Sequence, residues 1–237
     1  MTPEELVGQL QQALSDKLLS AVLYGSAAAG DFVEGTSNYN LLLIVERLGV
    51  EELNALVKPV SRWTREGHRP PLLFARGQLE ASADVFPIEL TDIRQSRRVL
   101  IGDDPMANVN IHQEHLRLQL ERELKGKLLA LREGYLMSLG RPKAVIQLLA
   151  SSVNGFLVLF RAALRLFQED VPSGKLEALH ALGRHVAFDP QPLVEAHELK
   201  HHGRTTRAAD PLALFQAYLT TIERVVEAVD RHLHPQT

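Results

Sequence analysis

The chain has 237 residues, 45% of them hydrophobic and 23% charged, which is typical of a folded globular protein with one large domain or two modest ones. A formal net charge of −3 lacks the basic excess of a dedicated nucleic-acid binder, so nucleic acid is not an expected partner. The chain has no cysteine, no basic and apolar leader and no apolar run long enough to span a membrane, so we expect a cytoplasmic protein without disulfides, thiolate metal sites or membrane contact.

The first half of the sequence alternates strand-like and helix-like patterns. Apolar runs predict five short strands, over 19–24, 39–45, 72–74, 85–90 and 99–101. Apolar residues at helical spacing predict helices over 3–17 and 50–66. Pro87 places the fourth strand at an edge or makes it a strand start, because proline cannot donate to a sheet.

The second half carries no strand signal. Helical spacing predicts helices over 111–139, 143–168, 174–186, 191–201 and 210–233. The second of these is apolar around most of its circumference, which is typical of the central helix of a bundle. We therefore predict an α/β fold: a domain over 1–108 with a small mixed sheet and helices on one face, followed by an all-α helical bundle over 109–237.

One motif points to chemistry. Gly25-Ser26 follows the first apolar strand, Gly30 follows a short helical stretch, and Asn38-x-Asn40 opens the second apolar strand. A glycine at such a turn lets the backbone approach a phosphate closely. A serine at the start of a helix adds a hydroxyl to free N–H groups that favour phosphate oxygens. Gly25, Ser26 and Gly30 are therefore the candidate nucleotide- or phosphate-binding residues.

The motif resembles the signature of nucleotidyltransferases of the DNA polymerase β superfamily, including the kanamycin-modifying and toxin–antitoxin types. In that family an Asp-x-Asp pair opens the second strand. The resemblance implies a polymerase-β-like domain in which this pair and a third carboxylate on a neighbouring strand hold two magnesium ions. Those ions activate the attacking hydroxyl and neutralise the leaving pyrophosphate.

The sequence departs from the family at both positions of the acidic pair. Asn38 and Asn40 are amides, whose oxygens can bind a hard cation but bring no negative charge. By resemblance, the third carboxylate would fall on the predicted strand at 85–90, with Glu89 as the best candidate and Asp92, just after that strand, as the second. Asp31 and Glu34 in the intervening loop are either solvated acids or additional cation ligands. Asn38, Asn40 and Glu89 form the degenerate catalytic site of the prediction, and no metal is assigned to it.

Two functions follow from these residues. In the first, the chain is a catalytically impaired nucleotidyltransferase that binds a nucleotide or another phosphate ligand, or acts as a regulatory module, with no assigned cofactor. In the second, it is an active enzyme that uses Mg²⁺ recruited through Glu89 and other acids to move a nucleoside monophosphate from an NTP onto a small-molecule or protein hydroxyl. A protein that only mediates protein contacts, as a homodimer or with another partner, stays open as a third alternative.

Overall fold

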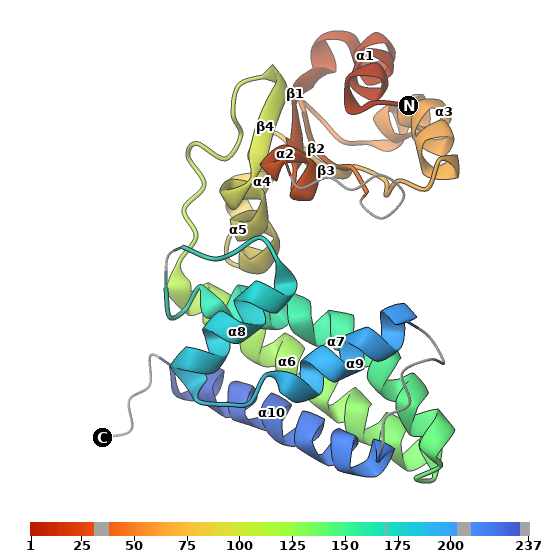
Figure 1. Ribbon diagram of the computed structural model, residues 1–237. Coiled ribbons are helices and arrows are strands. Elements are labelled where there is room, and N and C mark those ends of the chain that lie inside the picture. Colours follow the sequence, from red (N-terminus) through yellow and green to blue (C-terminus); the bar gives the residue numbers. More distant parts are fainter. Residues whose placement is uncertain (31–37, 169, 203–209, 233–237) are drawn as a thin grey trace. The chain divides into compact units, whose positions relative to one another are not determined.

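The structure, a computed structural model, describes residues 1–30, 38–168, 170–202 and 210–232. It divides into two compact units, Met1–His112 and Gln113–Thr237, where the sequence placed the division after residue 108 (Figure 1). The first unit contains all the strands of the described residues, and the second is helical. The predicted fold class, an α/β part followed by a helical part, is confirmed.

The first unit begins with a helix whose start is fixed by its own side chains. Thr2 Oγ1 accepts a hydrogen bond from Glu5 N, and Glu5 Oε2 accepts one from Thr2 N, which completes a capping box. The elements of this unit are α1 (Pro3–Leu14), a 3-10 turn (Ser15–Lys17), β1 (Leu18–Tyr24), α2 (Ser26–Ala29), β2 (Asn40–Val45), α3 (Val50–Arg65), β3 (Leu72–Ala75), α4 (Gln78–Ala81), α5 (Pro87–Gln95) and β4 (Arg97–Gly102).

The sheet is mixed and has the strand order β3-β2-β1-β4. β1 runs antiparallel to both of its neighbours, and β2 runs parallel to β3. Tyr24, the last residue of β1, pairs with Asn40 at the start of β2 and with Arg97 at the start of β4. The end of β1 and the starts of the other three strands therefore share one edge of the sheet.

Both faces of this sheet are covered, whereas the sequence predicted helices on one face only. Leu41, Leu43 and Val45 of β2 pack in one core cluster with residues of α1 and α3. Leu42 and Ile44 pack in another with residues of α4 and α5. Successive side chains of a strand point to opposite faces, so the uninterrupted apolar run of β2 is what a strand buried on both sides requires.

The predicted strand at 85–90 is wrong, because this segment enters α5. Pro87 takes the first position of that helix, where its missing N–H costs no hydrogen bond. Pro87, Leu90 and Ile93 are buried at steps of three, so the buried face follows a helical period. Within 85–90 alone the alternating apolar residues also fit a strand, and Ile93 lies outside that window.

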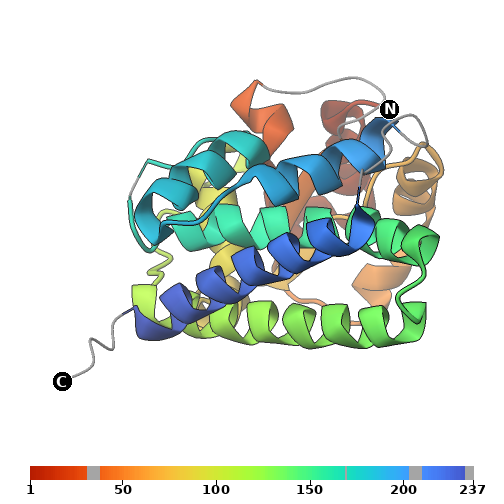
Figure 2. The same cartoon turned by 60° about the horizontal axis from the view of Figure 1, so that its bottom comes forward.

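The second unit is a helical bundle whose helices lie side by side in both ribbon views (Figures 1 and 2). Its helices are α6 (Gln113–Ser138), α7 (Pro142–Leu164), α8 (Lys175–Val186), α9 (Gln191–His202) and α10 (Pro211–Arg231). The helix α7 contacts α6, α8, α9 and α10, as expected for the central helix of a bundle. Phe156 of α7 is 1% exposed and lies edge-on to Tyr218 of α10, with ring centroids 6.0 Å apart.

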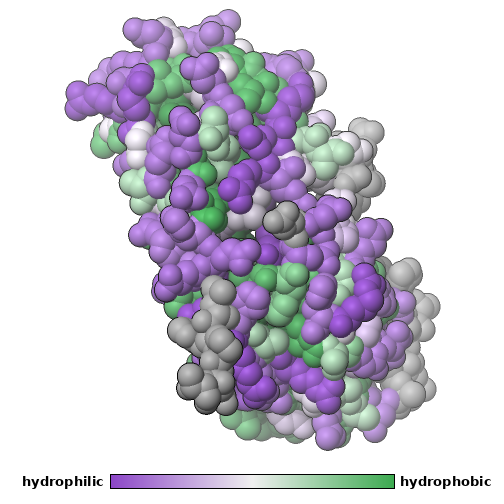
Figure 3. All heavy atoms as spheres, turned by 90° about the vertical axis from the view of Figure 1, so that its left-hand side faces the viewer, coloured by the Kyte–Doolittle hydropathy of each residue, from purple (hydrophilic) through white to green (hydrophobic). Residues whose placement is uncertain are grey.

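The helix α7 is also the one described helix long and apolar enough to cross a membrane, with a mean hydropathy of 1.6. A central bundle helix passes the same test, and ten residues of α7 are buried. On the face of the molecule that Figure 3 shows, hydrophilic residues predominate and hydrophobic residues form scattered patches.

Candidate functional site

The turn after β1 is built around Gly25. Its φ of +78° belongs to a region that glycine adopts without steric cost, and its N–H donates to the Ser96 carbonyl at 2.9 Å. The N–H groups of Ala28 and Ala29 donate back to the Gly25 carbonyl, which forms the short helix α2. Ser26 is the first residue of that helix, and Gly25 is its N-cap.

The two N–H groups at the start of α2 have no acceptor within the helix. They belong to Ser26 and Ala27, because the first N–H groups of any helix lie ahead of its hydrogen-bond ladder. Gly30 ends the helix with a φ of +86°, and its N–H donates to the Ser26 carbonyl. The predicted residues Gly25, Ser26 and Gly30 thus bound one short turn at the edge of the sheet.

Asn40 lies against this turn. It is the first residue of β2, and a Cβ added to Gly25 would lie 3.1 Å from Asn40 Nδ2. Asn40 has the same strand parity as Leu42 and Ile44, so it belongs to the face that α5 covers. Asn38 precedes the strand and is exposed. The structure therefore brings one of the two predicted amides directly to the glycine turn.

We expect Gly25→Ala to destabilise the protein and to displace the Asn40 amide. The positive φ costs an alanine about 1–2 kcal/mol, and the new Cβ makes a tight contact with Asn40 Nδ2 at 3.1 Å. Gly77→Ala is the matched control, because Gly77 has a φ of +76° and open space around its Cα. Urea unfolding and the NMR signal of the Asn40 side chain measure the two effects. An Asn40 signal that is unmoved in Gly25→Ala would contradict the contact.

Glu89 lies on helix α5, whereas the sequence placed it on a strand. Glu89 is exposed and Asp92 is half-buried one helical turn later. Leu90 and Ile93 of the same helix pack on the sheet face to which Asn40 belongs. The other acids of the prediction, Asp31 and Glu34, lie outside the described residues.

The pKa of Tyr24 is affected by the charged side chains that lie near this edge of the sheet. Burial raises the pKa of the Tyr24 phenol to about 12. The nearby positive charge of Arg69 lowers this pKa, and the negative charges of Asp92 and Glu89 raise it further. Tyr24 pairs with Asn40, so both candidate carboxylates lie close to the Asn40 end of β2. The phenol therefore stays protonated at neutral pH.

The residues at this edge do not fit a pair of magnesium ions. The two positions where the resemblance requires aspartates carry neutral amides. Among the described residues, no group of three or more His, Asp and Glu side chains lies close enough together to hold a metal ion. Hard divalent cations are held chiefly by anionic oxygen ligands, and among the described candidate residues the carboxylates, Glu89 and Asp92, both lie on α5.

Comparison of the chain with known proteins identifies its fold. No family model matches the sequence, and no curated protein matches it significantly. Among solved structures, the chain is similar to the spectinomycin adenyltransferase AAD(9) of Enterococcus faecialis, solved with ATP and spectinomycin. The TM-score is 0.59 over 95% of this chain and 100% of that chain, at 10% sequence identity. This chain has a nucleotidyltransferase fold.

Sequence reasoning missed the aromatic residues behind the motif of this nucleotidyltransferase fold. Tyr39, between the two amides, stacks on Trp63 of α3 with ring centroids 5.9 Å apart and lies 5.1 Å from the ring of His68. Sequence reasoning also missed Arg69, whose charge acts on Tyr24. The one sequence signal that bears on Tyr39 is its position in the predicted strand, which directs its side chain to the face opposite that of Asn40. Nothing in the sequence pairs it with residues 24 and 29 positions later.

Proposed function

We propose that this chain is a catalytically impaired nucleotidyltransferase-fold protein that binds a nucleotide or another phosphate ligand at the Gly25-Ser26 turn. The observation that carries the proposal is the Asn40 amide packed against Gly25, in the place where the resemblance requires a metal-binding aspartate. The glycine turn keeps the features that favour a phosphate, and the neutral amides remove most of the attraction for divalent metal.

We infer impaired catalysis from the size of the contribution that bound metal ions would make to nucleotidyl transfer. Metal ions in such sites supply several kcal/mol of charge stabilisation to the transition state. The Asn40 amide offers a donor as well as an acceptor, so it can hydrogen-bond to a phosphate oxygen that an aspartate would repel. The proposed role is therefore binding or regulation by a phosphate ligand, with Gly25, Ser26 and Gly30 as the contact residues.

Thermal unfolding of the full chain with ATP, with and without magnesium, tests the proposal. A ligand that binds only the folded state raises the unfolding temperature by mass action. We expect ATP to stabilise the wild type equally with magnesium and with a chelator. In the double variant Asn38→Asp, Asn40→Asp we expect stabilisation that depends on magnesium, because the added charges restore attraction for the cation. No stabilisation of the wild type by ATP under either condition would refute the proposed ligand.

The second candidate function is active transfer of a nucleoside monophosphate from an NTP to a hydroxyl, with release of pyrophosphate. The observation in its favour is that Glu89 and Asp92 both act electrostatically on Tyr24, next to Asn40. The test is incorporation of labelled nucleotide with magnesium, comparing the wild type with Glu89→Gln. Transfer by the wild type that is lost in Glu89→Gln would replace the first proposal with this one.

A further inference from the structure

Three aromatic rings form a cluster behind the Asn38-Tyr39-Asn40 segment. Tyr39 contacts Trp63 and His68, and the ring centroids of Trp63 and His68 lie 4.1 Å apart, so each of the three rings contacts the other two. Trp63 is fully buried, and its indole N–H donates to the Arg69 carbonyl at 2.8 Å. Trp63 is thereby fixed in position, and it forms the rigid part of the cluster against which Tyr39 and His68 rest.

Side-chain alternation along the chain relates the direction of Asn40 to the placement of Tyr39. Tyr39 packs with the core of α1 and α3, together with Leu41 and Leu43. Leu42, which has the same parity as Asn40, packs on the opposite face of the sheet. Since side chains alternate along a strand, holding Tyr39 in the first core directs Asn40 toward the second face and the glycine turn.

His68 is the titratable member of the cluster. Its Nδ1 atom is buried, and in the described part of the chain it has no hydrogen-bond partner. A neutral imidazole tolerates this as a bare acceptor nitrogen, whereas protonation would place an N–H there with nothing to accept it. The cluster is therefore compatible with neutral His68 and disfavours the imidazolium form.

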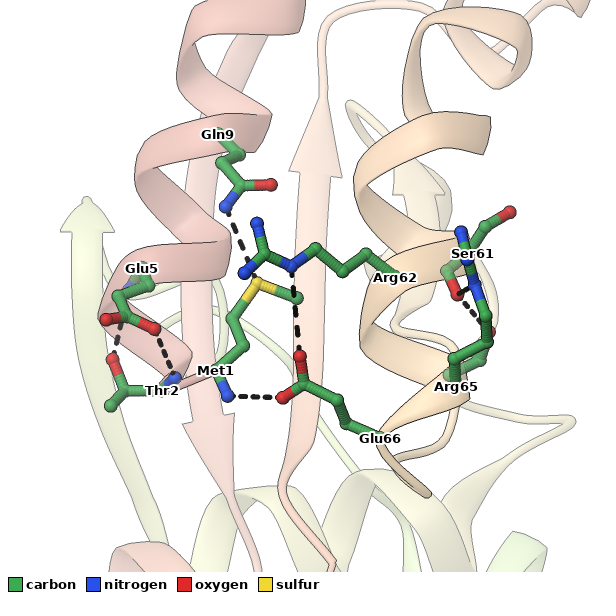
Figure 4. Close-up of polar contacts among 9 residues, drawn as sticks. Met1, Thr2, Glu5, Gln9, Ser61, Arg62, Arg65 and Glu66 are labelled. Atoms are coloured by element: carbon green, nitrogen blue, oxygen red, sulfur yellow. Dashed lines mark hydrogen bonds and ion pairs between the residues drawn. The ribbon is translucent and has the colours of Figure 1, made fainter.

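The charged groups around His68 favour the same state. Burial lowers the pKa of His68, the amino group of Met1, which precedes α1, lowers it further, and Glu66 opposes them. Glu66 is itself held by the Met1 amino group and by Arg62 of α3, which leaves little of its charge for His68 (Figure 4). The neighbouring residue Arg69 adds another positive charge to the same segment.

We propose that Tyr39 is the positioning residue of this site and that neutral His68 holds it in place, so that proton uptake by His68 frees Tyr39 and weakens phosphate-ligand binding beside Asn40. The ligand part of this inference rests on the proposed function. By linkage, a ligand that needs the ordered segment also favours neutral His68. Nucleotide affinity and the protonation of His68 then both depend on the equilibrium between Tyr39 held in the cluster and Tyr39 released from it.

Trp63 is the sole tryptophan of the chain, so its fluorescence reports on the cluster directly. An imidazolium in contact with an indole quenches its emission. We expect wild-type emission to fall between pH 8 and pH 5, with a midpoint below the ordinary histidine value of about 6.5. His68→Phe keeps an aromatic ring and cannot titrate, so its emission should stay constant. His112→Phe is the matched control, since His112 is exposed in the same unit, and it should titrate like the wild type.

The free energy of unfolding should also depend on the protonation of His68. The folded state holds the pKa of His68 below its ordinary value, so the unfolded chain binds the proton more readily. The contribution of neutral His68 is thus complete above about pH 6.5 and is lost as the pH falls through the lowered value. In urea unfolding, His68→Phe should lose less stability than the wild type between pH 7.5 and pH 5.5. Circular dichroism at pH 7.5 checks that each variant is folded.

Binding of ATP to the full chain at pH 7.5 and pH 5.5 tests the link to the site. ATP also takes up protons in this range, but that affects every variant alike. We expect the wild type to lose about threefold to tenfold more affinity than His68→Phe on acidification. Tyr39→Ala should bind weakly at both pH values, because it removes the ring that neutral His68 holds in place.

Each failure has a separate meaning. Emission that does not titrate in the wild type, or that titrates equally in His68→Phe, would overturn the inference whatever ATP does. Equal pH dependence of ATP affinity in the wild type and His68→Phe would overturn the link between cluster and ligand. Absence of ATP binding to the wild type at both pH values would overturn the proposed function, and the fluorescence comparison would then decide the structural part of the inference alone.

Discussion

Gly102→Ala is expected to destabilise the first unit by about 4 kcal/mol or more, which would unfold a marginally stable domain. Gly102 has a φ of +73°, and a Cβ at this position would lie 1.9 Å from the Leu19 carbonyl oxygen and 3.2 Å from Ser20 Cα. Both obstacles are backbone atoms of the paired strand β1, so no rotation of a side chain relieves them. The variant must open the ladder between β1 and β4 at its Ser20–Gly102 end.

Urea unfolding followed by Trp63 fluorescence measures this effect, because Trp63 belongs to the same unit. Gly67→Ala is the control: Gly67 has a φ of +93° and open space around it, so that variant bears the backbone strain alone. A loss in Gly102→Ala no larger than in Gly67→Ala would show that β1 can move aside at little cost.

Phe156→Ala is expected to cost the helical unit about 3–5 kcal/mol, the usual range for deleting a buried phenyl ring. Phe156 is 1% exposed, and its ring lies against those of Phe160 and Tyr218. Tyr218 is anchored in turn by a 3.0 Å hydrogen bond to Ser152, also on α7, so its ring cannot swing into the cavity without breaking that bond.

The helical signal in circular dichroism, recorded during urea unfolding, measures this loss. Val158→Ala is the control, because Val158 lies on the same helix and is 36% exposed. It should cost about 1 kcal/mol, since the change removes two methyl groups from a side chain that is only partly buried. Equal losses in the two variants would mean that the bundle collapses around the missing ring.

The sequence predicted the elements whose pattern spans their whole length. The leucine spacing of α1 and α6 and the apolar runs of β1 and β2 each admit one interpretation. Segment 85–90 admits two, and its true period appears only when Ile93 is included. The second covered face of the sheet depended on that segment, so the error about α5 also produced the one-sided sheet.

The parts of the site that are close together in the sequence were predictable, and the contacts between residues far apart in the sequence were not. The glycine turn and the amide pair lie within sixteen residues, and the resemblance of this segment to the nucleotidyltransferase signature implies that they meet. The contact of Tyr39 with Trp63 and His68 depends on how α3 crosses the sheet, which no short-range pattern contains. The proximity of Glu89 and Asp92 to Tyr24 similarly arises from packing between α5 and β1.

The strand order has a consequence for contacts between molecules. The outer strands are β3 and β4, and each is a poor template for an incoming strand. The four-residue strand β3 follows Pro70-Pro71, which cannot donate backbone hydrogen bonds. The strand β4 begins with Arg97 and Arg98, whose charges are committed to Asp104 and Glu4. Short edges, prolines and charges are the features that protect sheets against aggregation, so this sheet resists extension beyond its four strands.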